Sequence, residues 1–397
     1  MVQTQQEPPR RILLVHTHYR LPGGEDAVFA AERALLEARG HQVFVYERSN
    51  AEADGSLWQK LLLPLRAVFS RKAYREVRAL IRKHQIQLVH VHNTLLVTSP
   101  AVFWACFAEG VPAVQTLHNF RLFCPNGVLL RDGAVCEDCP ARGLQCALRH
   151  RCYRGSLAQT AVVAAAYALH RRLGTWRGVT LLAPTEFDRA KLLEFNRLRP
   201  LFDPERLAVK PNPVRLPRQA ALPWAARRDQ VVFAGRLEEL KGLRTVLEAW
   251  ALLGPDAPEL LVAGTGPLEA WARQHAGPRV RILGQLPPEE LARHMAESRA
   301  VAAASLCYES FALVPAEAHA LGTPVLASDL GNVGASVRPG VDGLRFAPGD
   351  AAALAAAVRQ LAGMTFDCAA IAAEARRRYS EEENYRALMR AYAKDQA

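Results

Sequence analysis

The hydrophobic positions of the first half of the chain follow two alternating spacings. Short runs rich in Val, Ile and Leu are separated by longer stretches in which apolar residues recur every three to four positions. In one such stretch Val28, Ala31, Leu35 and Ala38 share a helical face, and Gly40 follows as a helix-ending residue. This order is typical of a parallel α/β sheet. It predicts strands at Arg11–Tyr19, His41–Glu47, Gln87–His92, Val111–Leu117 and Thr180–Ala183.

The second half repeats this alternation and predicts a second sheet. Between the halves, Pro211–Gln230 holds four prolines and several charges, which interrupt any regular spacing. We therefore predict an N-terminal domain at residues 1–212, a linker at 213–229, a C-terminal domain at 230–380, and a helix at 381–397 that packs back on the N-terminal domain. The strands predicted for the second domain are Val231–Ala234, Leu260–Ala263, Val280–Leu283, Ala300–Ala304 and Pro324–Ala327.

Length and composition agree with two ordinary domains. The chain has 397 residues, of which 50% are hydrophobic and 22% charged, and these values exclude a wholly disordered protein. The most apolar stretch, Ala158–Leu169, is shorter than a membrane span, and Met1–Arg11 lacks the apolar core of a secretory signal. We therefore expect a cytoplasmic protein.

The net charge of +11 is confined to the first half of the chain. Residues 1–200 hold 27 Lys and Arg against 16 Asp and Glu, whereas residues 201–397 hold 23 of each. This asymmetry indicates either an anionic partner of the first half, such as a membrane surface or a nucleic acid, or a solvated basic surface. In Leu57–His84 eight Lys and Arg, among them Lys60, are interspersed with apolar residues. This pattern indicates either a basic amphipathic segment that lies on anionic lipid or a solvated helix packed on its own sheet.

Two cations follow the first predicted strand of the second domain. Arg236 and Lys241 come after the carboxyl end of that strand, where open α/β sheets bind ligands. Gly235 and Gly242 allow the backbone to approach a ligand closely. Two cations beside helix N–H groups are typical of a diphosphate site, and two solvated surface cations are the alternative.

Two carboxylates, Glu309 and Glu317, are separated by seven residues. Pro315 is tolerated only in the first turn of a helix, so we expect a helix to begin near Val314 and to end at Gly322. Glu309 then lies in a loop and Glu317 on the helix. Each carboxylate can accept hydrogen bonds from the neutral hydroxyls of a sugar or a ribose.

These segments resemble the retaining glycosyltransferases of family four, whose GT-B fold has two Rossmann-like parallel-sheet domains facing across a cleft. A G-R-L-x-x-x-K-G run combined with two glutamates at this spacing carries most of the resemblance, which covers nearly the whole chain. The matching stretches are Gly235–Gly242, Glu309–Glu317, Gly322–Val325, Gly264–Pro267, Asp342–Leu344, Gly23–Glu25 and Leu117–Asn119.

The resemblance implies a role for each of these residues. Arg236 and Lys241 would bind the diphosphate of a nucleotide-diphosphate sugar, Glu309 would hold sugar hydroxyls, and Glu317 would hold the ribose. His118 would lie beside the donor sugar, and the N-terminal loop would approach the diphosphate through two glycines, Gly23 and Gly24.

Backbone N–H groups at the start of the second-domain helix would help to seat the sugar and the phosphate. The family usually has glycine at the position of Ala312, but only the backbone is needed there, so the methyl group is expected to be tolerated. The residues concerned are Phe311, Ala312 and Leu313.

The expected reaction is hexosyl transfer with retention of anomeric configuration, in which the leaving diphosphate oxygen takes the acceptor proton. Catalysis is expected to need no metal or other cofactor, because Arg236 and Lys241 neutralise the developing charge and the sequence has no Asp-x-Asp motif.

The acceptor implied by the resemblance is a glycan or a lipid-linked molecule, in cell-surface polysaccharide assembly at the inner membrane face. An epimerase or hydrolase that acts on sugar nucleotides is the nearest alternative. A nucleic-acid-binding protein would leave the second-half residues unexplained, so no nucleic-acid partner is expected.

A cysteine-rich insert is predicted at residues 120–156 of the N-terminal domain. Cys136 and Cys139 form a C-x2-C pair of the kind that zinc uses, and the segment has too little periodic hydrophobicity for a core of its own. In the cytosol a metal is favoured over disulfides, and free thiols in a loop are the alternative. The predicted structural zinc ligands are Cys124, Cys136, Cys139 and Cys152, with Cys146 as a substitute for one of them.

Overall fold

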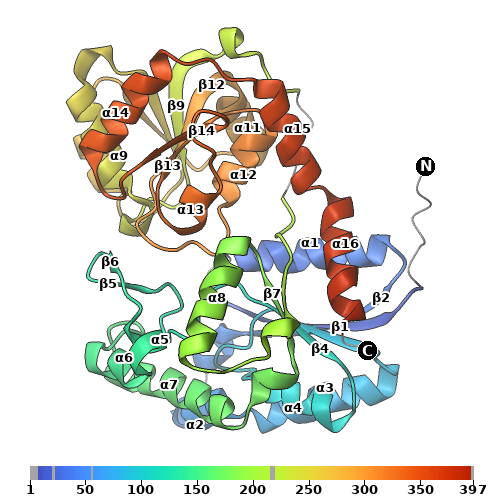
Figure 1. The fold of residues 1–397 in the computed structure, drawn as a ribbon. Coiled ribbons are helices and arrows are strands. Elements are labelled where there is room, and N and C mark those ends of the chain that lie inside the picture. Colours follow the sequence, from blue (N-terminus) through green and yellow to red (C-terminus); the bar gives the residue numbers. More distant parts are fainter. Residues whose placement is uncertain (1–7, 20–22, 55–56, 215–219, 395–397) are drawn as a thin grey trace. The chain divides into compact units, whose positions relative to one another are not determined.

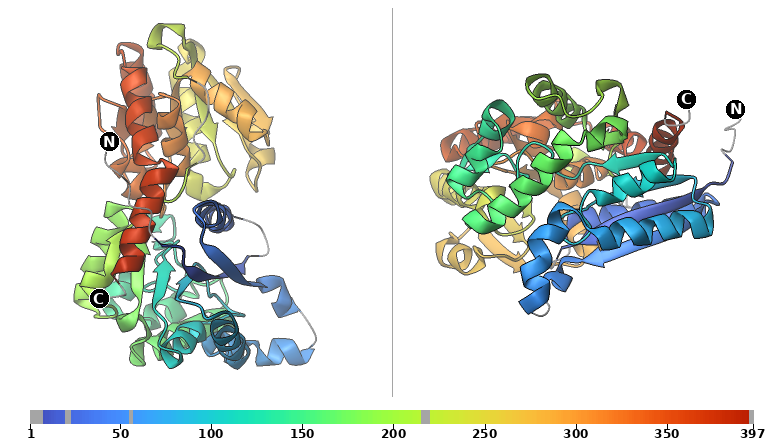
Figure 2. Two further views of the ribbon diagram at one scale, coloured as in Figure 1. Left: turned by 90° about the vertical axis from the view of Figure 1, so that its right-hand side faces the viewer. Right: turned by 90° about the horizontal axis from the view of Figure 1, so that it is seen from below.

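The computed structural model describes residues 8–19, 23–54, 57–214 and 220–394, and the side chains of residues 53–62 lie outside this description. The chain forms two compact units. The first consists of the chain up to Leu129, Cys136–Pro213 and the segment from Glu381 onward, and the second consists of Leu130–Val135 and Val214–Ser380. Helices cover both faces of the sheet in each unit (Figures 1 and 2).

The first unit is built on a six-stranded parallel sheet in the order β2-β1-β3-β4-β7-β8. All residues of the strands β3, β4 and β7 are buried, including polar ones such as His90 and Gln115, as expected for the inner strands of a parallel sheet. The strands are β1 Arg11–His18, β2 Gln42–Ser49, β3 Leu88–Val91, β4 Ala113–Thr116, β7 Thr180–Ala183 and β8 Leu207–Val209. The helices are α1 Gly24–Ala38, α2 Leu57–Val68, α3 Arg71–His84, α4 Ala101–Ala108, α5 Asp138–Arg142, α6 Gln145–His150, α7 Leu157–Arg172, α8 Glu186–Leu198 and α16 Glu381–Ala393.

The second unit repeats the design with the sheet order β11-β10-β9-β12-β13-β14, again parallel throughout. Its strands are β9 Arg228–Ala234, β10 Glu259–Ala263, β11 Val280–Gly284, β12 Ser298–Ala303, β13 Val325–Ser328 and β14 Gly343–Phe346. Its helices are α9 Leu243–Leu253, α10 Glu269–His275, α11 Pro288–Glu297, α12 Leu313–Ala320, α13 Gly331–Ala335, α14 Ala351–Ala362 and α15 Cys368–Arg378.

The prediction of two Rossmann-like parallel sheets is confirmed, with differences at the edges. The strands β8 and β14 are absent from the prediction, because Leu207–Val209 has only three residues and Gly343–Phe346 is interrupted by Arg345. The predicted linker is wrong at its end, since residues 228 and 229 already belong to β9, where Arg228 pairs with Ser298. Residues 215–219 of the linker lie outside the described residues.

The predicted insert is divided between the units. Its antiparallel hairpin, β5 Leu130–Arg131 and β6 Ala134–Val135, groups with the second unit, and the rest of the insert groups with the first. The insert therefore does not form one block within the N-terminal domain.

The C-terminal helix α16 is part of the first unit (Figure 1). Leu388 and Tyr392 of this helix are completely buried and join a core that includes Ile12 of β1 and Leu88 of β3. The side chain of Asn384 donates a hydrogen bond to the carbonyl of Pro211 (2.6 Å). Burial of apolar side chains at both ends of the chain therefore holds its last helix against the first sheet.

Candidate active site

In the second sheet the chain order reverses between β9 and β12, which are neighbours. Ligands of open α/β sheets bind at the carboxyl ends of the strands beside such a switch point. Arg236 and Lys241 follow β9, and Glu309 follows β12. The fold therefore places the predicted cations and one of the predicted carboxylates at this switch point.

Glycines let the loops after these strands approach one another. At Gly264, after β10, an added Cβ would lie 1.9 Å from the carbonyl oxygen of Gly235, and φ is +131°. At Gly242 (φ +70°) an added Cβ would lie 2.0 Å from the carbonyl oxygen of Ala304, just after β12. Both positions exclude any side chain, so the β9 loop runs directly against its neighbours.

Lys241 and Glu309 form an ion pair with Nζ and Oε2 2.8 Å apart. Burial by itself would lower the pKa of Lys241, but the carboxylate of Glu309 outweighs it and raises the pKa. The ammonium group is therefore retained at neutral pH. The Ser305 hydroxyl donates a hydrogen bond to the other oxygen of Glu309.

Arg236 is the more accessible cation. Its side chain is 56% exposed, and its Nε lies 3.3 Å from Oε2 of Glu238. Glu238 also acts electrostatically on Lys241, so it links the two predicted cations. Glu238 lies between them in the chain, at a position that the G-R-L-x-x-x-K-G run leaves unspecified.

The segment between Glu309 and Glu317 accepts hydrogen bonds from a side chain that follows another strand. The side-chain amide of Asn332 donates to the carbonyl oxygens of Glu309 (2.5 Å) and Ser310 (3.1 Å). The helix α12 begins at Leu313, and half-buried Glu317 lies on it. Asn332 follows β13, and no local motif identifies it from the sequence.

One predicted backbone donor already has an acceptor. The N–H of Leu313 donates to the carbonyl oxygen of Phe311 at 3.1 Å. A role of the N–H groups of this segment toward sugar and phosphate stays a prediction. The Phe311 ring packs edge-on against Tyr379 of the segment after α15. Ala312 is the buried residue that precedes α12.

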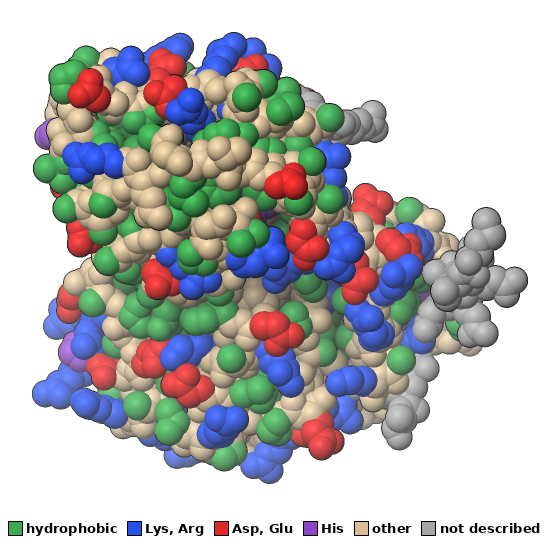
Figure 3. Space-filling model, turned by 45° about the horizontal axis from the view of Figure 1, so that its top comes forward, with side chains coloured by type: hydrophobic (Ala, Val, Ile, Leu, Met, Phe, Trp, Pro, Cys, Tyr) green, Lys and Arg blue, Asp and Glu red, His purple; other side chains and the backbone are tan. Residues whose placement is uncertain are grey.

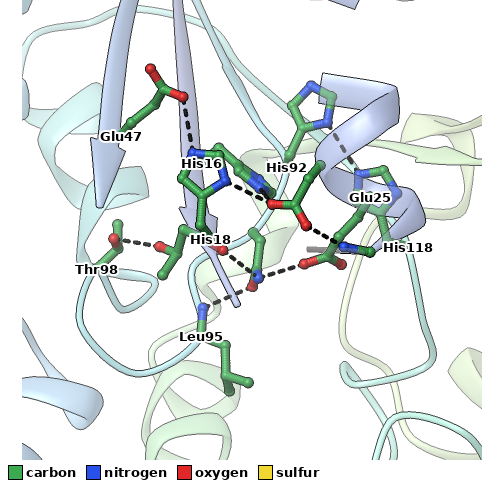
Figure 4. A network of polar contacts seen from close by, with 12 residues as sticks. His16, His18, Glu25, Glu47, His92, Leu95, Thr98 and His118 are labelled. Atoms are coloured by element: carbon green, nitrogen blue, oxygen red, sulfur yellow. Dashed lines mark hydrogen bonds and ion pairs between the residues drawn. The ribbon is translucent and has the colours of Figure 1, made fainter. Parts of the chain in front are cut away.

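The first sheet has its own switch point, between β1 and β3. Gly23 has an extended backbone, its N–H donates to Oδ2 of Asp26 (2.7 Å), and Gly24 begins α1. Asp26 Oδ1 lies 2.9 Å from Nε2 of His16 and 2.7 Å from Nδ1 of His18 (Figure 4). The two glycines thus adjoin a carboxylate–histidine network that no sequence motif identifies.

Glu25 belongs to the same end of the first sheet. Its Oε1 accepts a hydrogen bond from Nδ2 of Asn93 at 2.7 Å (Figure 4). Burial raises the pKa of Glu25 to about 8, against the opposing effect of Arg121.

His118 follows β4 and lines a small polar pocket together with Asn93, Asn119 and Arg121. Its Nε2 lies 3.1 Å from Nδ1 of His92 (Figure 4). Burial lowers the pKa of His118 to about 3, so its ring is neutral at physiological pH. The ring can therefore donate one hydrogen bond and accept one.

The cysteine segment brings several thiols near Cys139. Burial raises the pKa of the Cys139 thiol to about 12, and the neighbouring Cys124, Cys152 and Cys146 act in the same direction. All eight cysteines are free thiols. Among the described residues, two groups have three ligand atoms within 4.8 Å of one another, and neither includes a cysteine. A metal would therefore have to draw the thiols closer together.

The basic stretch forms two helices, α2 and α3, with Ser70 capping α3. The apolar face of α3 is buried through Ala73, Val77 and Ile81, so it is not available to lipid. Arg78 and Arg82 are paired with Glu109. Lys60 lies outside the described side chains.

Among the residues whose side chains are described, the exposed cations of this stretch are Arg66 on α2 and five residues of α3: Arg71, Lys72, Arg75, Arg82 and Lys83. On the face shown in Figure 3, Lys and Arg lie among Asp and Glu rather than in one continuous basic patch. Among the described residues, no helix combines the length and apolar character that crossing a bilayer requires.

Sequence comparisons match both halves of the chain. Residues 22–218 match a family described as Glycosyltransferase Family 4, and residues 228–363 match one described as Glycosyl transferases group 1. A glycogen synthase of Mycobacterium tuberculosis is 38% identical over 154 residues, 36% of this chain and 37% of that protein. A phosphatidyl-myo-inositol mannosyltransferase of Mycobacterium leprae is 34% identical over 194 residues, 46% of this chain and 52% of that protein. The chain thus spans only 37% and 52% of these relatives' lengths.

Solved structures resemble the chain over nearly its whole length. Anabaena HepE, in complex with UDP, superposes with a TM-score of 0.65 at 18% identity, covering 97% of this chain and 100% of that one. A glycosyltransferase from Rickettsia africae gives 0.66 at 14% identity, with coverage of 98% and 99%. At these identities the likeness concerns the fold.

Proposed function

Because the chain belongs to glycosyltransferase family 4 and has its GT-B fold, we propose that it moves a sugar from a nucleotide-diphosphate sugar to a glycan or lipid-linked acceptor, with retention of configuration. The observation that carries this proposal is the Lys241–Glu309 pair at the switch point of the second sheet. A screen of nucleotide sugars, in which the released nucleoside diphosphate is measured, tests it.

The donor diphosphate binds between Arg236 and Lys241 in this proposal. Diphosphate oxygens compete with the Glu309 carboxylate for the Lys241 ammonium, and Glu309 then accepts hydrogen bonds from sugar hydroxyls. Glu317, on α12, holds the ribose. The complexes of HepE with UDP and with UDP-glucose support a donor of this class.

The transfer proceeds on one face of the sugar. As the bond between the anomeric carbon and the diphosphate oxygen breaks, negative charge develops on that oxygen, where Arg236 and Lys241 stabilise it. The acceptor hydroxyl adds to the anomeric carbon and gives its proton to the leaving diphosphate. These two cations supply the charge that a metal ion would otherwise provide, so we propose a metal-independent reaction.

On the first unit, neutral His118 and the backbone at Gly23 and Gly24 contact the donor sugar and diphosphate in this proposal. The acceptor is a precursor of a cell-surface polysaccharide, and the exposed cations of α3 hold the enzyme at an anionic membrane surface on the cytoplasmic side. The charge excess of the first half supports this surface role.

We further propose that the cysteine segment holds a structural zinc ion. The donor set fits zinc chemistry, since Cys136 and Cys139 have the spacing of a knuckle and Cys124 and Cys152 adjoin Cys139. The ion would fix the short helices α5 and α6 and would take no part in the transfer.

A further inference from the structure

A line of polar side chains runs from His118 into the core of the first unit. His118 and His92 are stacked, with ring centroids 5.3 Å apart and the 3.1 Å contact between Nε2 and Nδ1 (Figure 4). On the far side of His92, its Nε2 lies 3.5 Å from Oε2 of Glu32. The other oxygen of Glu32 contacts the ammonium group of Lys210. Glu32, His92 and Lys210 are all buried.

Lys210 determines the direction of donation along this line. Burial lowers the pKa of Lys210, but contact between opposite charges favours the charged forms of both groups. An ionised carboxylate can only accept hydrogen bonds. Nε2 of His92 lies 3.5 Å from Glu32 and makes no hydrogen bond to it in this structure, but the negative carboxylate favours an N–H over a lone pair at this buried nitrogen. We therefore infer that His92 carries its proton on Nε2.

The proton on His92 then fixes the proton on His118. Burial holds the pKa of His92 well below its ordinary value, so the ring is neutral and has a single N–H group. With that proton on Nε2, Nδ1 of His92 is an acceptor, and the contact at 3.1 Å requires His118 to donate from its own Nε2. His118 is neutral as well, so its Nδ1 carries the lone pair.

We propose that Glu32 and His92 are positioning residues that hold His118 in the Nε2–H tautomer and make its Nδ1 a hydrogen-bond acceptor for a sugar hydroxyl. The contact with a sugar hydroxyl rests on the proposed function. The tautomer of His118 does not, because it is a property of the protein itself. A carboxylate behind a histidine fixes tautomers in this way in other active sites.

His90 provides a matched control within the same cluster. It lies on β3, two residues before His92, and its Nδ1 is 3.8 Å from Glu32 Oε2. Its ring nitrogens instead contact the hydroxyls of Tyr392 and Thr116, both at 2.8 Å. His90 therefore shares the burial and the carboxylate but does not lie on the path to His118.

The tautomer can be read from nitrogen–proton correlation spectra of the protein labelled with 15N-histidine, with His118→Gln used to assign the signal. We expect His118 to carry its proton on Nε2 in the wild type. In Glu32→Gln we expect the oxygen of the new side-chain amide to stay against the Lys210 ammonium group, so that the amide NH2 group faces His92. His92 must then accept at Nε2 and donate from Nδ1, and His118 switches to the Nδ1–H tautomer. His90→Gln should leave the His118 signal unchanged.

The kinetic consequence is loss of one hydrogen bond to the substrate, which raises KM for the donor by roughly tenfold in Glu32→Gln. An Nδ1–H tautomer in the wild type, or an unchanged His118 signal in folded Glu32→Gln, overturns the relay. If Glu32→Gln does not fold, the relay is tested by the tautomer of His118 in the wild-type spectrum and by the KM of His92→Gln for the donor. An unchanged KM in His92→Gln contradicts the role of His92. A tautomer switch in a protein that turns over no nucleotide sugar would instead refute the proposed function and leave the relay standing.

Discussion

Lys241 and Glu309 are in contact, with Nζ 2.8 Å from Oε2, although they come from loops after two different strands. The contact exists because β9 and β12 are neighbours in the sheet. It brings a retained positive charge and an acceptor carboxylate to the place where open α/β sheets bind ligands.

Removing either member of this pair should disable transfer. We expect Lys241→Ala and Glu309→Ala each to lower kcat by about a hundredfold or more, on the order of 3 kcal/mol of transition-state stabilisation. Steady-state kinetics with a nucleotide-sugar donor measure the change. The control is Arg299→Ala, since Arg299 pairs with Asp229 at 3.0 Å at the amino ends of β12 and β9. Near-wild-type turnover in both site variants would contradict the assignment.

His18 should make the stability of the first unit depend on pH. It bridges Asp26 (2.7 Å) and Glu47 (2.9 Å). Burial by itself would lower the pKa of His18, but these hydrogen bonds outweigh it and raise the pKa above the ordinary 6.5. A histidine whose pKa is higher in the folded state than in the unfolded state stabilises the fold. This stabilisation is complete at pH values below the unfolded-state pKa and is lost as the pH rises through the folded-state pKa.

The free energy of unfolding should therefore fall as the pH is raised from the ordinary histidine value of 6.5 through the folded pKa of His18. His18→Gln should remove this part of the slope, and urea denaturation at a series of pH values measures it. His275→Gln is the control, because His275 contacts the backbone carbonyl of Trp271 at 2.8 Å. Identical slopes in the wild type and in His18→Gln would argue against the bridge.

The zinc proposal is tested by elemental analysis of the purified protein. We expect about one zinc per chain, lost in Cys139→Ser together with a lower Tm. In Cys106→Ser the metal should remain, because this buried thiol donates to the carbonyl of Val102 in α4, outside the cysteine segment. A wild-type protein without zinc or iron would leave the thiols free.

The membrane proposal concerns the exposed cations of α3. Co-sedimentation should be stronger with anionic than with neutral vesicles, and Arg71→Glu/Arg75→Glu should weaken it by about tenfold or more, since each basic residue near such a surface contributes roughly 1 kcal/mol. The double variant Arg281→Glu/Arg293→Glu, at two exposed cations of the second unit, is the charge-matched control. Equal sedimentation with both kinds of vesicle would indicate a solvated basic surface.

Sequence patterns predicted the features that are set by residues close together in the chain, namely the buried strands and the start of a helix. The apolar runs of β9 and β10 are buried on the inner strands of a sheet, and Pro315 correctly places the start of α12 within one residue. The edge strand β14 has only four residues, which begin with glycine and include the exposed Arg345, so its composition did not predict a strand.

Contacts between distant segments could not be predicted. Glu32 occurs in the sequence between Ala31 and Arg33 like a solvated helix residue, and only the arrival of β3 and Lys210 makes it a buried partner of His92. Asn332 likewise supports the loop at Glu309 only because β13 lies beside β12. Both depend on sheet order, which no local pattern contains.

In the proposed function, the second unit binds a nucleotide-diphosphate sugar through Arg236, Lys241, Glu309 and Glu317. The most direct test incubates the wild type and Lys241→Ala with a panel of nucleotide sugars, with and without glycan or lipid-linked acceptors, and measures the nucleoside diphosphate released. We predict that the wild type releases nucleoside diphosphate from at least one donor, and that release is faster with an acceptor and at least about a hundredfold slower in Lys241→Ala. Folded wild-type protein that releases nucleoside diphosphate from none of the donors, or equal release by the variant, would contradict it.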